Sequence, residues 1–373
     1  MQTWKNIIKV GYGLAMVLIL IACDSPESQN EDLSSTTSFF LENTENARYE
    51  NKLTIVGNAL GTTFTVKTGE DSLRITPADL EAFFNAFNAE LSTYIPSSLI
   101  SRFNATDTVI NLNETKYFKT SFEKSQEVFE ITNGSFDPSI FPLVKLWGFV
   151  TDIDKKPEQE KIDSVLQFIG FKEGELYVYE NGFLSKKDKR FQLVFNAVAK
   201  GQAVDEIAKI LNERGQNSYY IEIGGELITK GLNDRNSKWV IGIDEPVESN
   251  AGIKGVSERL LENYIEISDK AMATSGNYRD FYELDGEKYS HTLSTKTGMP
   301  VRKSILSATV IADDVATADA YATAFMEMGV DSTLALLKNN PHLKIEAYLL
   351  FNNGKDKIER AYSSGMSGYL RDK

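Results

Sequence analysis

The sequence has very little cysteine and histidine. Its 373 residues include one cysteine, Cys23, and two histidines, His291 and His342. A single thiol cannot form an intramolecular disulfide or a thiolate metal cluster, and two histidines argue against a site built from several imidazoles. Any bound metal must therefore rely on oxygen ligands.

Positive charge is also scarce. The chain has 40 Lys and Arg against 53 Asp and Glu, which gives a net charge of −13. This balance argues against nucleic acid as a partner, because a phosphate backbone is bound by basic surfaces. Hydrophobic residues are 42% and charged residues 25%, as in ordinary globular proteins. The length allows one large core rather than several large domains.

The N-terminus has the pattern of an export signal. Lys5 and Lys9 precede an apolar run at 10–21, which is too short to span a bilayer comfortably. The run ends in Leu20-Ile21-Ala22-Cys23, which resembles a bacterial lipobox. This resemblance implies removal of residues 1–22 and a lipid on Cys23. The alternative is a plain secretory signal with an incidental cysteine.

The segment after Cys23 is rich in Ser, Thr, Asn, Glu and Gln up to residue 50, which predicts a flexible tether. Asp24 resembles the inner-membrane retention signal of some bacteria. We therefore expect an exported lipoprotein, anchored in the membrane through Cys23, at the periplasmic face of the inner membrane. No linker divides residues 51–370, which are expected to form one main domain.

Helix and strand signals alternate irregularly along that domain. Thr76-Pro77 marks a helix start, and a core-facing stripe of Leu and Phe follows it. Further helices are expected at 117–131, from Ala199 to a C-terminal cap at Gly215, and at 319–328 and 332–338. Strands are expected at 63–67, 192–195, 219–223, 239–243, 264–267, 305–311 and 346–351. This order predicts an α+β fold.

Asp319 and Thr323 lie four residues apart among alanines. On a helix they share one face, and the small neighbours leave room for a ligand. A carboxylate and a hydroxyl can supply part of a Mg²⁺ shell. By spacing alone, the simpler explanation is a helix-terminal Asp and a packed Thr.

Residues 196–201, Asn-Ala-Val-Ala-Lys-Gly, form a strand-to-helix turn with small side chains. A helix N-terminus favours anions, and Lys200 adds a point charge suited to a phosphate. The glycine spacing of a P-loop is missing, so the motif alone is weak. His291 could act as a base, although a lone histidine is more often structural.

Two further segments can each be interpreted as structural or as functional. Gly224-Gly225 follows a strand and fits either a tight turn or a close backbone approach to a ligand. Tyr94 and Phe136 stand beside polar residues, so their rings could stack on a flat heterocycle or belong to the core.

Taken in order, the motifs resemble those of the ApbE family of FAD:protein FMN transferases. The matching segments include Leu60-Gly61-Thr62-Thr63, Leu91-Ser92-Thr93-Tyr94, Gly134-Ser135-Phe136-Asp137-Pro138, and residues 142–149, 196–205, 223–226, 273–278, 290–291, 297–301 and 317–329. They cover nearly all of residues 55–330. The resemblance implies one T-fold-like flavin transferase domain with mixed or antiparallel sheets and packed helices.

The resemblance also implies site residues. FAD, the substrate, would contact Leu60, Tyr94, Ser135, Phe136, Asp137, Val194, Lys200 and Leu293. Mg²⁺ would be held by the Ala197 carbonyl, Asp319 and Thr323, and His291 would lie near the reacting phosphate. At two places the sequence departs from the family, which usually carries Asp at the position of Val194 and Asp-Pro in place of Ser294-Thr295.

The activity that follows is Mg²⁺-dependent transfer of FMN from FAD to a Thr or Ser hydroxyl of an acceptor protein, with release of AMP. The catalytic residues would be His291 and Asp319, and the general base is either His291 or a carboxylate. The acceptor would be a flavin-carrying subunit of a membrane redox complex. The alternatives are an FAD pyrophosphatase and a non-catalytic flavin-binding lipoprotein.

Overall fold

The computed structural model describes residues 47–150, 153, 155–247, 260–277, 281–284, 287–290, 292–301, 304–354 and 357–371, the side chains of 281–284 and 287–290 excepted. Cys23, the expected signal peptide at 1–22 and His291 lie outside these residues. Strand β1 begins at Arg48, three residues before the expected start of the main domain. Within the described ranges, no helix is both long enough and apolar enough to cross a bilayer.

A nine-stranded sheet organises the fold, in the order β1-β2-β3-β7-β8-β11-β14-β15-β16. Each neighbouring pair is antiparallel. The bounds are Arg48–Asn51 (β1), Thr54–Ala59 (β2), Thr62–Lys67 (β3), Tyr219–Ile223 (β7), Glu226–Lys230 (β8), Lys270–Gly276 (β11), Ile305–Ala312 (β14), Glu346–Asn352 (β15) and Ile358–Tyr362 (β16). The expected strands at 63–67, 219–223, 305–311 and 346–351 are confirmed within these bounds.

Three smaller antiparallel sheets accompany the large one. They are the three-stranded β4-β6-β5 (Val109–Asn111, Phe183–Lys186, Tyr177–Glu180) and the pairs β9-β10 (Trp239–Asp244, Leu261–Ile267) and β12-β13 (Phe281–Leu284, Glu287–Ser290). The pair β9-β10 includes the expected strands at 239–243 and 264–267.

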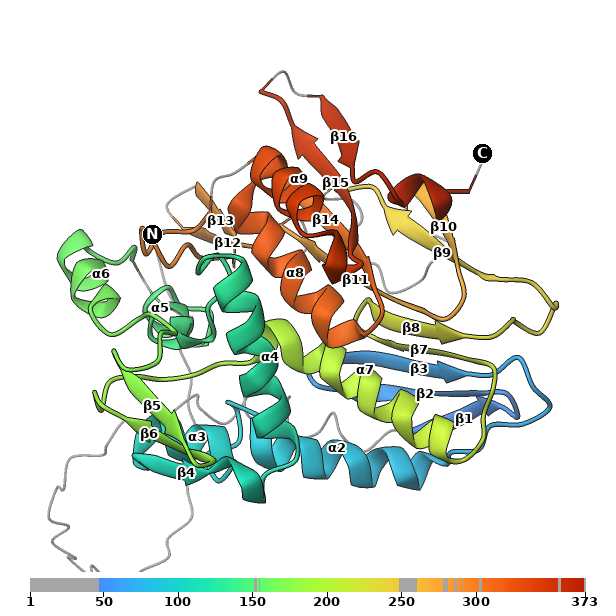
Figure 1. Ribbon diagram of the computed structural model, residues 1–373, viewed down its shortest axis with the longest axis horizontal. Coiled ribbons are helices and arrows are strands. Elements are labelled where there is room, and N and C mark those ends of the chain that lie inside the picture. Colours follow the sequence, from blue (N-terminus) through green and yellow to red (C-terminus); the bar gives the residue numbers. More distant parts are fainter. Residues whose placement is uncertain are drawn as a thin grey trace, which may run out of the picture.

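Helices cover one face of the large sheet, and Figure 1 shows α7 and α8 lying across it. The α-helices are α2 (Pro77–Leu91), α3 (Leu99–Ala105), α4 (Tyr117–Ile131), α5 (Phe141–Leu146), α6 (Gln159–Leu166), α7 (Asn196–Glu213), α8 (Val315–Met328) and α9 (Val330–Asn339). Neighbouring residues of β11 face opposite ways: Ala271 enters the main core beneath the helices, and Met272 enters a second cluster with β9 and β10. The α+β prediction is confirmed.

Local signals account for the start of α2 and the end of α7. The Thr76 side chain accepts from the Asp79 backbone N–H at 3.2 Å, and the Asp79 carboxylate accepts from the Thr76 N–H at 2.8 Å. This capping box starts α2 at Pro77. Gly215 has φ +74 and follows α7, in agreement with the expected cap.

The strand expected at 192–195 was wrong, because that segment pairs with no strand among the described residues. Asn104 satisfies its backbone instead: the amide nitrogen donates to the Leu193 carbonyl at 2.7 Å, and the Leu193 N–H donates to the amide oxygen at 2.8 Å. The Val194 N–H donates to the Pro138 carbonyl at 2.8 Å. The segment that these hydrogen bonds hold leads directly into α7, which begins at Asn196 rather than near Ala199.

Candidate active site

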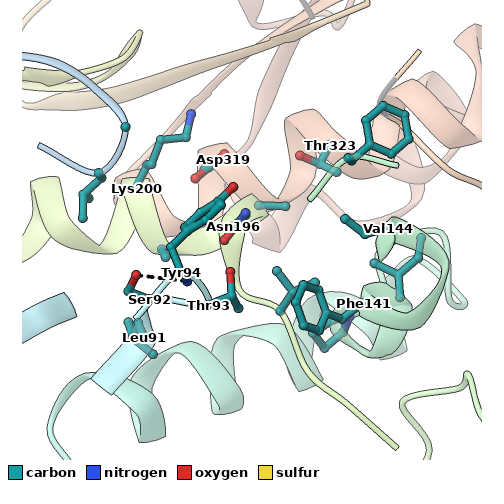
Figure 2. A pocket seen from close by; sticks show the side chains of 18 of the residues that line it. Leu91, Ser92, Thr93, Tyr94, Phe141, Val144, Asn196, Lys200, Asp319 and Thr323 are labelled. Carbon is teal, nitrogen blue, oxygen red and sulfur yellow. Dashed lines mark hydrogen bonds between the residues drawn. The ribbon is translucent and has the colours of Figure 1, made fainter. Parts of the chain in front are cut away.

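A cavity of about 870 Å³ opens beside the N-terminal part of α7, where α8, strand β11 and the loop after α2 meet. Its size suits a small-molecule ligand. Figure 2 shows Tyr94, Asn196, Lys200 and Asp319 around this space, with Thr323 on the same helix as Asp319. Every predicted site residue in the described part of the chain lines this cavity: Leu60, Tyr94, Ser135, Phe136, Asp137, Val194, Ala197, Lys200, Leu293, Asp319 and Thr323.

The structure therefore gathers residues that are distant in sequence. It leaves their individual roles as predictions. His291 lies outside the described residues, but Thr292 and Leu293, which follow it, both line the cavity.

Two buried carboxylates and one lysine form the charged centre of the cavity. Asp319 is 3% exposed and Glu226 is 4% exposed. The Lys200 ammonium donates to Glu226 Oε1 at 2.6 Å, and the Gly201 backbone N–H donates to Asp319 Oδ2 at 3.1 Å. Burial raises the pKa of Asp319, and the nearby charge of Glu226 raises it further, while Lys200 opposes both.

This centre fits a divalent cation bound through oxygen. Glu226 Oε2 is buried and accepts no hydrogen bond from the residues that the structure describes, and buried carboxylate oxygens without partners are costly. Thr323 Oγ1 lies 3.3 Å from Ser275 Oγ, which places two more hydroxyl oxygens at the same wall. A cation near Asp319 would offset the excess negative charge.

Only part of a metal shell can come from acidic side chains. The described residues contain no cluster of three or more His, Cys, Asp or Glu side chains suited to a metal. Mg²⁺ commonly binds one or two carboxylates and completes its shell with waters and substrate phosphates. The donors on this wall, a carboxylate, hydroxyls and the backbone near Ala197, match that chemistry.

Close packing of α7 against α8 fixes the position of Asp319. A Cβ on Gly201 would lie 2.5 Å from the Val315 carbonyl oxygen, so only glycine allows the two helices to approach this closely. The Asp205 carboxylate accepts from the backbone N–H groups of Val315 and Ala316, both at 2.9 Å. Asp205 thus caps α8 from α7, and it satisfies donors that a helix N-terminus otherwise leaves unpaired.

Sequence reasoning missed the contributions of Gly201, Asp205 and Glu226. All three stand within the motifs that carried the family resemblance, but no local pattern distinguishes a helix-spacing glycine or a cap reaching another helix. The signal available in the sequence was the spacing of Gly201 and Asp205, which are four residues apart and so lie on one face of the helix predicted over 199–215.

Tyr94, Phe136 and Asp137 also line the cavity. Burial raises the pKa of Tyr94, and a hydrogen bond with the Asn196 side chain opposes the shift. Phe136 is 3% exposed and belongs to the main core while it lines the cavity. Asp137 accepts from the Ser139 N–H at 2.8 Å and its hydroxyl at 2.6 Å, and burial raises the pKa of Asp137 to about 6.

The glycine pair is a tight turn that also borders the cavity. Gly224 and Gly225 have φ +63 and +104 and connect β7 to β8 as a two-residue hairpin loop. Gly224 lines the cavity, and a Cβ there would lie 2.7 Å from the Thr62 side chain. The tight turn is therefore confirmed, and a close backbone approach of Gly224 to a ligand stays a prediction.

The order of the motifs and the geometry of the cavity both support a family assignment. The family model described as "ApbE family" matches residues 60–349. The chain belongs to the ApbE family. The cavity lies within the matched region, as all of its lining residues fall between Leu60 and Thr323.

Relatives and solved structures align with most of the chain. It is 29% identical to the FAD:protein FMN transferase of Vibrio cholerae serotype O1 over 333 residues, which are 88% of this chain and 90% of that protein. Its structure is similar to the flavin transferase ApbE from Vibrio cholerae, with a TM-score of 0.73 over 85% of this chain and 99% of the other at 29% identity. The apo flavinyl transferase ApbE of Pseudomonas stutzeri gives a TM-score of 0.72 over 84% and 95% of the chains, at 27% identity.

Proposed function

We propose that this ApbE family member is an FAD:protein FMN transferase, which moves FMN from FAD to a Thr or Ser hydroxyl of an acceptor protein. The observation that carries the proposal is the convergence of the predicted FAD and Mg²⁺ residues on one cavity around buried Asp319 and Glu226. Relatives named FAD:protein FMN transferases, which align over 90% of their own length, support the same activity.

The reaction exchanges one phosphate bond for another. The acceptor hydroxyl oxygen attacks the phosphorus on the riboflavin side of the FAD pyrophosphate and forms a new O–P bond. The P–O bond to the adenylate half breaks, and AMP leaves with the bridging oxygen. The hydroxyl proton passes to a general base, which is His291 or a carboxylate of the site.

The residues of the chain would bind and orient the substrate for this exchange. Lys200 is one third exposed, so its ammonium can turn from Glu226 to a phosphate oxygen of FAD. Tyr94 and Phe136 offer flat apolar surface to the ring systems. When bound, Mg²⁺ held by Asp319, Thr323 and the Ala197 carbonyl would neutralise charge that develops on the phosphoryl oxygens.

The test compares two Asp→Ala variants. The full chain is incubated with FAD, Mg²⁺ and a flavin-carrying subunit of a membrane redox complex, and the acceptor is analysed by mass spectrometry. We expect Asp319→Ala to abolish FMN transfer, and Asp331→Ala, at an exposed position of the neighbouring α9, to retain it.

Transfer that survives in Asp319→Ala would contradict the assigned metal site. Release of FMN and AMP at the same rate with and without acceptor would instead favour an FAD pyrophosphatase. Tight FAD binding with neither product would favour a flavin-binding role.

We also propose that the transferase acts at a membrane surface. The lipobox-like Leu20-Ile21-Ala22-Cys23 supports lipid attachment at Cys23, and Asp24 supports retention at the periplasmic face of the inner membrane. An acceptor subunit of a membrane redox complex would then share the membrane with the enzyme. Labelled palmitate should enter the wild-type chain and not Cys23→Ser, whereas equal labelling of both would refute the anchor.

A further inference from the structure

Strand β11 has neighbours of unequal length. It pairs with β14 from Ala271 to Gly276, but with β8 only from Lys270 to Met272. The difference arises because β8 starts at Glu226, directly after the Gly224-Gly225 turn. In the part of the chain that the structure describes, no strand pairs with β11 beyond Met272 on the β8 side.

The register shows which backbone groups face that side. Successive residues of an antiparallel strand direct their N–H and C=O groups to opposite neighbours. The Asn277 N–H donates to the Leu306 carbonyl at 3.1 Å, so Asn277 and Ser275 face β14. Thr274 and Gly276 therefore direct their N–H and C=O groups away from β14, towards the side that β8 leaves open. We call residues 274–276 the open edge of β11.

The open edge borders the reaction centre. Thr274, Ser275 and Gly276 all line the cavity and are half-buried. Ser275 Oγ lies 3.3 Å from Thr323 Oγ1, and Thr323 is one helical turn from Asp319. A chain bound along the open edge would thus pass beside the proposed Mg²⁺ site.

We propose that the open edge binds the acceptor polypeptide as an added β-strand and so presents its hydroxyl to the FAD phosphate. This inference rests on the proposed FMN transfer. The outward groups of Thr274 and Gly276 repeat every second residue, which matches the hydrogen-bonding period of an extended polypeptide. The phosphates of a dinucleotide such as FAD accept hydrogen bonds but donate none, so they cannot pair with the outward C=O groups.

Strand addition explains how acceptor and nucleotide share one cavity. Main-chain hydrogen bonds supply affinity without reading the sequence, and side-chain pockets supply the choice of acceptor. Pairing also fixes the acceptor residue in register, because a slip by one residue turns its hydroxyl to the other face. The nucleotide remains on the α7 and α8 side, beside Lys200 and Asp319.

A peptide scan tests the proposal with the intact enzyme. The probe is a ten-residue peptide with one central Thr, chosen as the best FMN acceptor from a library of such peptides. Each backbone nitrogen is methylated in turn, which removes one donor. We expect methylation at alternate positions to raise KM for the peptide about tenfold, the effect of losing a well-made hydrogen bond, and intervening positions to change it little. A scan without this alternation would overturn the proposal.

Two substitutions of Gly276 test the same hydrogen bonds from the side of the enzyme. Gly276→Pro removes the N–H that faces the open edge and none that pairs with β14. Gly276→Ala keeps that N–H and also adds a side chain, so the two variants are compared with each other. We expect KM for the peptide to be about tenfold higher in the proline variant than in the alanine variant, with KM for FAD equal in both.

The outcomes distinguish a failure of acceptor docking at the open edge from a failure of the proposed FMN transfer. An equal rise in KM for FAD in Gly276→Pro would assign the open edge to the nucleotide and overturn acceptor docking. If Gly276→Pro does not fold, the peptide scan with wild-type enzyme decides alone. A wild-type enzyme that modifies no library peptide and no protein acceptor overturns the proposed transferase function itself, and the docking with it.

Discussion

Replacing Gly201 by Ala tests whether the α7–α8 contact sets the geometry of the site. The added Cβ would lie 2.5 Å from the Val315 carbonyl oxygen and 2.8 Å from the Ala316 nitrogen. Ordinary contact needs about 3.4 Å, so the helices must separate by roughly 0.9 Å. Both atoms belong to backbone, which cannot swing aside as a side chain can.

The stability change is the difference of two effects. Overpacking of this kind costs about 1–3 kcal/mol, whereas Ala in place of Gly favours a helix by about 1 kcal/mol. We therefore expect a loss of roughly 0–2 kcal/mol in the free energy of unfolding. The rate of FMN transfer should change more than the stability does, because a shift near 1 Å would break the 3.1 Å hydrogen bond from the Gly201 N–H to Asp319. Misplacement on that scale lowers a rate by about 100-fold.

The assay is FMN transfer to an acceptor at saturating FAD, together with urea denaturation. Gly368→Ala is the control, since no heavy atom lies within 4 Å of its Cβ position. This control should change stability by less than about 0.5 kcal/mol and leave transfer intact. If Gly201→Ala transfers FMN at the wild-type rate, the argument that helix spacing positions Asp319 is refuted.

Three further predictions concern stability. Thr76→Ala removes the capping box of α2 and should lower the unfolding free energy by about 1 kcal/mol in urea, with transfer unchanged; no loss would contradict the cap. Asn104→Leu leaves the Leu193 N–H and C=O groups without these hydrogen bonds and should lower the free energy of unfolding by about 2–4 kcal/mol. A loss below about 1 kcal/mol would contradict the role given to the Asn104 side chain. Burial raises the pKa of Asp205 to about 7. The folded state therefore holds that proton more tightly than the unfolded state. The free energy of unfolding should fall as pH rises from about 4 to 7, by roughly 1.4 kcal/mol per pH unit at most for this one group. Asp205→Asn should flatten this slope, and an unchanged slope would contradict the assignment.

Elements defined by local signals could be predicted from the sequence. The helix after Thr76 carries its own cap, proline and apolar stripe, so its start needed no tertiary information. The hairpin at Gly224-Gly225 is equally local, since the two glycines allow positive φ. The residues that line the cavity could be identified by a different route, through the order of family motifs rather than through any one pattern, and their roles stay predictions.

Features that depend on distant partners could not be predicted in this way. Residues 192–195 have the composition of a strand, but Asn104, 89 positions away from Leu193, takes up their hydrogen bonds. The pairing of Lys200 with Glu226 joins α7 to the start of β8, and neither residue signals the other. Strand order is likewise non-local, because β3 pairs with β7 although the six helices α2 to α7 and the three-stranded sheet β4-β6-β5 stand between them in the sequence.

The stoichiometry of products tests the central claim most directly. Wild-type enzyme is incubated with FAD, Mg²⁺ and a flavin-carrying acceptor protein, and the AMP released is counted against the FMN covalently attached. FMN transfer predicts one AMP for each FMN bound to the acceptor, through a Thr or Ser oxygen located by fragmentation. AMP release without attached FMN, or attached FMN without AMP, would contradict the transfer reaction proposed for this site.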